Sequence, residues 1–217
     1  MNDPLEWYYE IPIVSRLYLT GSFLTTAACA LELVSPFSLY FNFNLIFFKG
    51  QVWRLVTNFM FFGLFSLDFL FHMYFVVRYC RLLEEGSFRG RTADFVYMLL
   101  LGALAMILVA PFVSIHFLGS SLTFMMVYLW GRRNEHVRMS FLGFATTDLI
   151  GIIVGHGYYF LEDVYPTIAN IRGWKTQRPL ATPRLICYLF DPRPVVVAGE
   201  QVINHFGANG NDHLHME

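Results

Sequence analysis

The chain has 217 residues, of which 56% are hydrophobic and 14% are charged. A soluble domain has about 45–50% apolar and about 25% charged residues. This composition excludes an ordinary soluble domain and a disordered chain, and it favours a protein whose solvent is the lipid bilayer. The formal net charge of −1 gives no basic surface for phosphates, so nucleic acid is not expected as a partner.

Five apolar segments are candidate membrane spans. They cover residues 17–34, a stretch within 57–79, and segments near 94–111, 115–131 and 142–161. Residues 35–56 mix aromatic and polar side chains, which predicts a loop or short helices at the membrane interface. The segment from residue 164 to the end of the sequence is rich in Pro, Gly and Asn. We therefore expect an all-α membrane domain over residues 1–163 and a flexible tail over residues 164–217.

Arginines in short loops predict orientation, because such loops stay on the cytoplasmic side. The loops after the second and fourth segments hold Arg78, Arg81, Arg89, Arg91, Arg132, Arg133 and Arg138. Five alternating spans would then place the basic tail on the opposite, arginine-poor side, which conflicts with the charge rule. Either the last segment is re-entrant, or a helix between Gly143 and Asp148 is missing from this chain.

The last apolar segment carries a pair of small residues and a histidine. Gly151 and Gly155 lie about one helical turn apart, which lets another helix approach closely. His156 follows, and an ionisable residue at membrane depth is a candidate for function. For the two glycines, helix packing is the simpler interpretation. For His156, the simpler interpretation is a neutral side chain bonded to a neighbouring helix. Paired with Ser121, His156 gives an alternative hypothesis, an intramembrane serine protease.

Trp53 and Arg54 stand where the second apolar segment begins. Tryptophan prefers the membrane interface, while arginine either snorkels to the headgroups or is held by neighbouring acceptors through its planar fork of donors. Asn58 follows one helical turn later. Interfacial anchoring alone is the simpler interpretation of the Trp-Arg pair.

Metal and disulfide chemistry find little support in the sequence. Cys29, Cys80 and Cys187 are odd in number and have no zinc spacing. The pair His213 and His215 lies in the tail, where few neighbours are available to orient metal ligands. We therefore expect neither a metal nor a cofactor.

Three motifs carry a family resemblance. They are Trp53-Arg54-Leu55-Val56-Thr57-Asn58-Phe59, Glu84-Glu85-Gly86-Ser87-Phe88-Arg89-Gly90-Arg91-Thr92-Ala93-Asp94-Phe95 and Gly151-Ile152-Ile153-Val154-Gly155-His156-Gly157. Together they closely resemble the Derlin family, the protease-dead relatives of rhomboid proteases in the endoplasmic reticulum membrane. The similarity covers residues 7–143 and resumes at Asp148. It implies six helices in the rhomboid arrangement and a role in moving misfolded proteins from the lumen to the cytosol for degradation.

The resemblance also implies partners, namely misfolded clients, a membrane ubiquitin ligase and a cytosolic AAA ATPase. We further expect contact with the lipid bilayer and homo- or hetero-oligomers. Two departures from the family matter. The fifth helix of the family is absent between Gly143 and Asp148. The distribution of arginines among the loops also indicates a missing helix at this position. The tail motif at residues 206–210 has Ala208 in place of the first glycine of Phe-x-Gly-x-Gly, so only indirect contact with the ATPase is expected.

The resemblance weighs against the protease hypothesis. Active rhomboids place their histidine about one turn before the small-residue pair, and Asp148 occupies that position here. An aspartate is a poor general base near neutral pH. A small solute transporter, the other alternative, would require inverted repeats, and the sequence has none.

We therefore predict a rhomboid-like helical bundle in the endoplasmic reticulum membrane that is not an enzyme and assists the retrotranslocation of misfolded proteins. Trp53 and Arg54 are predicted to serve client passage and membrane thinning. Gly151 and Gly155 are predicted to pack helices. The remaining candidates, as structural polar residues, are Asn58, Asp148 and His156.

Overall fold

The computed structural model describes residues 4–113, 115–134, 146–173 and 179–190. These residues form helices and, within those ranges, no β-strand, so the predicted all-α class is confirmed. The α-helices are α1 (Pro4–Glu10), α2 (Ile13–Ala30), α3 (Phe43–Lys49), α4 (Arg54–Met60), α5 (Leu67–Leu82), α6 (Thr92–Val113), α7 (Gly119–Arg133), α8 (Thr146–Tyr159), α9 (Tyr165–Ile171) and α10 (Arg184–Phe190). A short 3₁₀ turn, η1 (Pro36–Ser38), and two π-helical turns, η2 (Leu83–Ser87) and η3 (Phe160–Val164), complete the list.

The second predicted span is divided into two helices. Helix α4 ends at Met60, and α5 begins at Leu67. Between them Gly63 has a φ of 99°, a conformation that glycine adopts readily and other residues avoid. Ser66 then caps α5, because its hydroxyl accepts a hydrogen bond from the Phe69 amide at 3.2 Å. The other four predicted spans correspond to helices α2, α6, α7 and α8.

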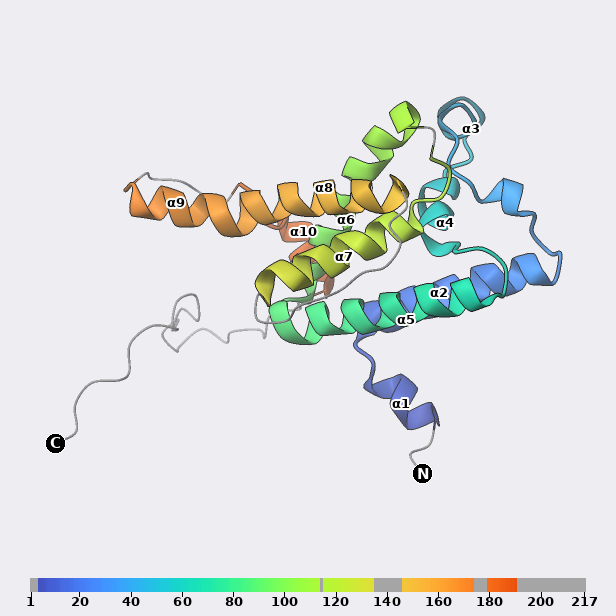
Figure 1. Ribbon diagram of the computed structural model, residues 1–217, viewed down its shortest axis with the longest axis horizontal. Helices are drawn as coiled ribbons and strands as arrows, with labels where there is room; N and C mark the ends of the chain where they lie inside the picture. Colours follow the sequence, from blue (N-terminus) through green and yellow to red (C-terminus); the bar gives the residue numbers. More distant parts are fainter. Residues whose placement is uncertain (1–3, 114, 135–145, 174–178, 191–217) are drawn as a thin grey trace.

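Helix α7 lies at the centre of the bundle and contacts α4, α5, α6 and α8 (Figure 1). Its inward side chains belong to one core cluster together with residues of α5 and α6. Fully buried members of this cluster include Met98, Met106, Met125, Met126 and Leu129. Because methionine is unbranched and adaptable, it fills the irregular gaps between helices that cross at different angles.

Helices α7 and α8 are neighbours that run in the same direction (Figure 1). From the start of α7 to its end, Ser121 faces Gly151, Tyr128 meets His156, and Arg133 pairs with Asp163. Two neighbouring spans of equal direction require the chain to return across the membrane between them. The connection from α7 to α8 consists of residues 134–145, which is shorter than the roughly 20 residues of a membrane helix.

The loops gather at two ends of the bundle. At one end the guanidinium of Arg133 lies 4.7 Å from the centre of the Phe88 ring, so the two arginine-rich loops meet. At the other end the Phe41 amide donates to the His116 carbonyl at 2.7 Å. Since Asp163 pairs with Arg133, α8 leads to the arginine-rich end. Helices α7 and α8 therefore both lead to the arginine-rich end, which is the arrangement that the missing-helix alternative predicts.

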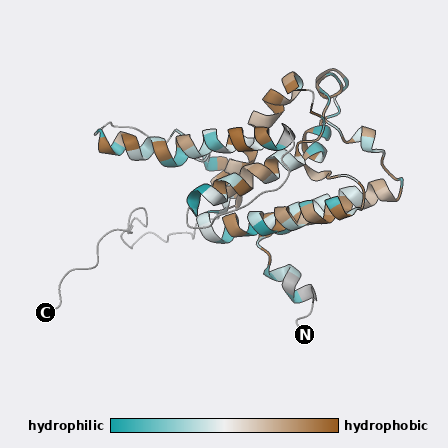
Figure 2. Ribbon diagram, in the orientation of Figure 1, coloured by the Kyte–Doolittle hydropathy of each residue, from teal (hydrophilic) through white to brown (hydrophobic). Residues whose placement is uncertain are grey.

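Helix length separates α6 from its neighbours. Among the described residues, α6 alone is long and apolar enough to cross a bilayer, with 22 residues and a mean hydropathy of 2.5. Helix α7 has 15 residues, whereas α5 and α8 continue without a break into the π-helical turns η2 and η3. At a rise of about 1.5 Å per residue α7 extends roughly 22 Å, against a hydrocarbon core of about 30 Å. Figure 2 shows α6 largely apolar and the C-terminal end of α7 hydrophilic. The number of spans stays a prediction.

The segment predicted as a flexible tail contains helices. The chain is helical from α8 through η3 to Ile171, because Pro166 falls in the first turn of α9, where proline is tolerated. Further on, the Thr182 hydroxyl donates to the Asp94 carboxylate at 2.5 Å, and α10 packs against α6. Helix therefore runs through the predicted boundary at residue 163, and the division into two domains stays a prediction.

The shared direction of α7 and α8 predicts which positions face the same side of the membrane. Single cysteines at the exposed positions Arg89, Asn170 and Lys49 would be labelled with a membrane-impermeant maleimide in sealed microsomes, in a background with Cys29, Cys80 and Cys187 replaced by Ser. We expect Arg89→Cys and Asn170→Cys to react from one side and Lys49→Cys from the other. Labelling of Asn170→Cys together with Lys49→Cys would contradict the parallel arrangement.

Candidate functional site

Arg54 is the first residue of α4, and its side chain points into the protein, where it is 5% exposed. Nη1 donates to the carbonyl oxygens of Phe37 and Tyr40, both at 2.9 Å, while Nε donates to the side-chain oxygen of Gln51 at 2.7 Å. The guanidinium also lies 4.9 Å from the centre of the Tyr40 ring, a cation–π contact. Arg54 therefore joins α4 to the preceding loop.

The geometry decides between the two roles considered for Arg54. A snorkelling arginine extends its charge toward headgroups, whereas this guanidinium is enclosed by protein acceptors. Within the described residues no carboxylate pairs with it, so carbonyl oxygens and an aromatic face provide the compensation that a buried charge requires. The planar fork allows Nε and Nη1 to serve separate partners, which a lysine ammonium reproduces poorly.

The loop held by Arg54 has a defined structure. The Ser35 hydroxyl accepts a hydrogen bond from the Phe37 amide at 3.3 Å and caps η1. Asn42 caps α3 by accepting from the Leu45 amide at 3.2 Å. The Thr57 hydroxyl donates to the Leu39 carbonyl at 3.2 Å, a second link to α4. We call residues 35–53 the interfacial lobe; it is the segment in which the sequence predicted a loop or short helices.

Asn58 connects the interfacial lobe's base to the central helix. It is 0% exposed, and its amide nitrogen donates to the carbonyls of Arg54 at 2.5 Å and Leu55 at 3.1 Å. Its own backbone carbonyl accepts from the Leu118 amide at 3.2 Å, immediately before α7. The structure thus brings Arg54 and Asn58 together as one rigid corner.

Trp53 lies beside Arg54 but faces outward and is 52% exposed. Other large apolar side chains of the interfacial lobe are exposed as well, namely Phe37, Phe43, Phe47, Phe48 and Val52. Aromatic side chains at this position suit the boundary between headgroups and hydrocarbon. The lobe therefore has an inner face fixed by Arg54 and an outer apolar face that includes Trp53.

Gly151 and Gly155 lie where α8 crosses α7. A β-carbon on Gly151 would overlap the carbonyl oxygen of Ser121. One on Gly155 would lie 3.1 Å from the Tyr128 ring and 3.3 Å from Met125, closer than most real contacts. Both glycines therefore permit an approach of the two helices that a side chain would prevent.

The structure does not bring Ser121 and His156 together. Ser121 lies opposite Gly151, about one and a half turns from His156 along α8. Instead, Nδ1 of His156 is 2.6 Å from the Tyr128 hydroxyl. Asp148, near the start of α8, is buried. His156 is thus bonded to a neighbouring helix, the simpler of the two states considered from the sequence.

Glu84 is a buried residue that the sequence analysis named only as part of a family motif. Its carboxylate accepts hydrogen bonds from the amides of Val14 at 3.1 Å and Ser15 at 2.9 Å, and from the Ser15 hydroxyl at 2.7 Å. Pro12 precedes α2 and provides no side-chain cap, so Glu84 supplies the missing acceptor from 69 residues away. In the sequence, the absence of a capping side chain before α2 is the only indication of this contact, and it does not identify Glu84 as the acceptor.

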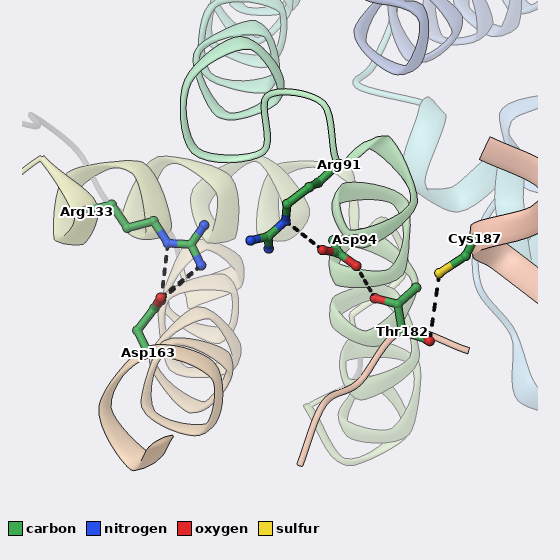
Figure 3. A network of polar contacts seen from close by, with 6 residues as sticks. All are labelled: Arg91, Asp94, Arg133, Asp163, Thr182 and Cys187. Carbon is green, nitrogen blue, oxygen red and sulfur yellow. Dashed lines mark hydrogen bonds and ion pairs between the residues drawn. The ribbon is translucent and has the colours of Figure 1, made fainter. Parts of the chain in front are cut away.

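A polar hollow of about 780 Å³ opens at the arginine-rich end. Arg133 donates to the Asp163 carboxylate at 3.0 Å on one side, and Arg91 donates to Asp94 at 2.7 Å on the other (Figure 3). Asp94 also accepts from Thr182, which ties the segment before α10 to α6 (Figure 3). Within the described residues no group of three or more His, Cys, Asp or Glu side chains is placed to hold a metal.

Comparison with known sequences identifies the family. The sequence profile of the Der1-like family matches residues 11–147. The chain is 44% identical to Derlin-2.2 of Arabidopsis thaliana, with 98% of each chain covered, and 46% identical to Derlin-2 of Oryza sativa subsp. japonica, with 95% and 96% covered. This protein belongs to the Der1-like family, the Derlins. The resemblance found in the sequence is confirmed, and the chain is a membrane protein.

More distant relatives include a probable derlin-2 homolog of Dictyostelium discoideum, 40% identical over 90% of this chain and 87% of that one. The alignment to the Arabidopsis relative extends over 245 positions, whereas this chain has 217 residues, so at least 28 aligned positions lack a residue here. That number is large enough for one membrane helix of roughly 20 residues. One missing crossing between α7 and α8 would leave a gap of this size.

The contact between α7 and α8 predicts an order of stability for three glycine variants. We expect Gly151→Ala to destabilise the protein by about 1–3 kcal/mol, because the added methyl group meets backbone that has no freedom to move aside. Gly155→Ala should destabilise the protein less than Gly151→Ala, because its β-carbon would meet side chains and a more distant carbonyl. Gly157→Ala is the matched control, since nothing lies within 4 Å of its β-carbon position and alanine favours helix. Thermal unfolding in detergent would measure the order, and equal melting of the Gly151 and Gly157 variants would contradict it.

Proposed function

We propose that this Derlin is a non-catalytic component of endoplasmic-reticulum-associated degradation that helps misfolded proteins pass from the lumen or membrane to the cytosol. The proposal places it in the endoplasmic reticulum membrane. The observation that carries it is the short length of the central helix α7, which has 15 residues, beside the full-length α6. Family membership supports the same role.

The physical reason is the cost of moving a polar chain through hydrocarbon. Each unsatisfied backbone group costs several kcal/mol in the bilayer core. A helix that is roughly 8 Å shorter than a core of about 30 Å, as α7 is, favours local thinning of the bilayer, because the lipids adjust to the shorter apolar surface. A thinner bilayer shortens the path over which a client is exposed to hydrocarbon.

The interfacial lobe fits this role at the end opposite the arginine-rich loops. Arg54 fixes its inner face, so the outer aromatic face keeps a constant position relative to α4. Trp53 and the exposed phenylalanines then hold the lobe in the headgroup region. In this proposal the lobe forms a rigid edge of the thinned region, and Arg54 is a positioning residue.

The proposal assigns no catalytic residue. His156 is engaged with Tyr128, and Ser121 lies at a different level of the helix pair. A serine nucleophile requires a base within hydrogen-bond reach. These positions support a scaffold over an intramembrane protease.

Partners follow from the proposed role. Clients reaching the cytosolic side require ubiquitination and extraction, so we propose association with a membrane ubiquitin ligase and, indirectly, with a cytosolic AAA ATPase. The tail motif at residues 206–210 lies outside the described residues. Homo- or hetero-oligomers remain part of the proposal, because a chain one crossing short leaves apolar helix surface without an internal partner.

The test is the turnover of a misfolded luminal reporter, followed by pulse-chase in cells that depend on this protein. We expect Arg54→Ala to slow turnover strongly and Arg54→Lys to slow it nearly as much. A lysine keeps the charge but loses the fork, and each hydrogen bond to a charged group contributes about 1.5–3 kcal/mol. Trp53→Ala should have an intermediate effect.

Two variants serve as controls, with protein levels held equal. Arg89→Lys changes an exposed arginine at the other end and should leave turnover unchanged. Ser121→Ala should also leave it unchanged, whereas an intramembrane protease would lose activity. Normal turnover with Arg54→Ala would refute the role of the interfacial lobe, and loss with Ser121→Ala would favour the protease.

A further inference from the structure

A groove of about 450 Å³ runs between α2 and α5 toward the arginine-rich end. Its walls are mainly apolar, with Leu19 from α2 and Met73, Tyr74, Val77 and Leu82 from α5. Arg78 and Arg81 lie on its rim. The groove thus combines an apolar channel with two cationic groups near the C-terminal end of α5.

The two arginines retain donors for a ligand. The guanidinium of Arg78 is 6.0 Å from the centre of the Tyr74 ring, and in the described part of the chain no carboxylate pairs with it. Arg81 donates through Nε to Glu85 at 2.9 Å, a contact between partly exposed side chains. A surface pair of this kind is weak and compensates the charge only in part. The rim therefore carries a net positive charge.

The surface beside the groove is suited to acyl chains. Exposed apolar residues continue along both helices on either side, with Leu17, Phe23 and Leu24 on α2 and Leu67, Leu70 and Phe71 on α5. A soluble anion would lose its hydration in an apolar channel without compensation, and a protein partner would have to displace lipid from the channel. A molecule with one anionic head and long apolar chains matches both parts of the groove.

We propose that this groove binds one anionic phospholipid, with its phosphate on Arg78 and Arg81 and an acyl chain between α2 and α5. Guanidinium groups recognise phosphate through parallel N–H donors, and basic pockets between membrane helices are known lipid-headgroup sites. The lipid belongs to the leaflet at the arginine-rich end. It fills the gap between α2 and α5 beyond the point where Glu84 caps α2. This inference does not depend on the proposed function.

The test is lipid retention by the purified full-length chain, measured by native mass spectrometry after titration with phosphatidylserine or phosphatidylcholine. We expect preferential retention of one phosphatidylserine. Arg78→Gln and Arg81→Gln should each weaken it about fivefold, since a basic side chain near anionic lipid contributes on the order of 1 kcal/mol. Arg89→Gln, an exposed arginine of the same end outside the groove, is the matched control and should retain the lipid.

Two further measurements separate a lipid site from simple attraction of charge. Val77→Trp fills the groove and leaves both arginines in place, so it should abolish retention while unfolding at the wild-type temperature. Inorganic phosphate should fail to displace the bound lipid at concentrations equal to those of the titrated lipid. Equal retention of both lipids, an equal loss with Arg89→Gln, full retention with Val77→Trp, or displacement by phosphate would each overturn the proposal.

Discussion

The contact between the backbone of α7 and Gly151 of α8 sets the arrangement of this bundle. No β-carbon fits between Gly151 and the Ser121 carbonyl, so the helices approach until backbone meets backbone. From that point the pairs Tyr128 with His156 and Arg133 with Asp163 follow in register. Helix α7 is central, so its partner on this side also determines where η3, α9 and the polar hollow lie.

Parallel packing of α7 and α8 links three facts that are otherwise separate. The charge count of the loops is off by one crossing, the connection of residues 134–145 is shorter than a membrane helix, and relatives have at least 28 more aligned positions. A fold in which one return crossing is absent accounts for all of them. The close contact of α7 and α8 persists because it depends on glycines and backbone within those two helices and not on the missing segment.

The helical class, the close packing at Gly151 and Gly155 and the arginine-rich end were predicted from the sequence. Each depends on residues that are near one another along the chain. The break at Gly63 was missed, since the apolar run continues across a glycine whose φ only the folded chain reveals. The inward direction of Arg54 was one of two open alternatives, because its acceptors are carbonyls that any sequence supplies. Glu84 was missed because a cap 69 residues away leaves no periodic signal. A composition rich in Pro, Gly and Asn predicted a flexible tail, although Pro166 lies in the first turn of α9.

The most direct test of the parallel packing is cross-linking of cysteine pairs between α7 and α8 with a short bismaleimide in native membranes, with Cys29, Cys80 and Cys187 replaced by Ser. The side chains of Arg133 and Asp163 meet at 3.0 Å, so their α-carbons are within reach of such a reagent and the Arg133→Cys/Asp163→Cys pair should be cross-linked efficiently. The pair Arg133→Cys/Asp148→Cys places the second cysteine near the opposite end of α8 and should remain unlinked. Efficient cross-linking of Arg133→Cys with Asp148→Cys, and none with Asp163→Cys, would show antiparallel helices and contradict this account.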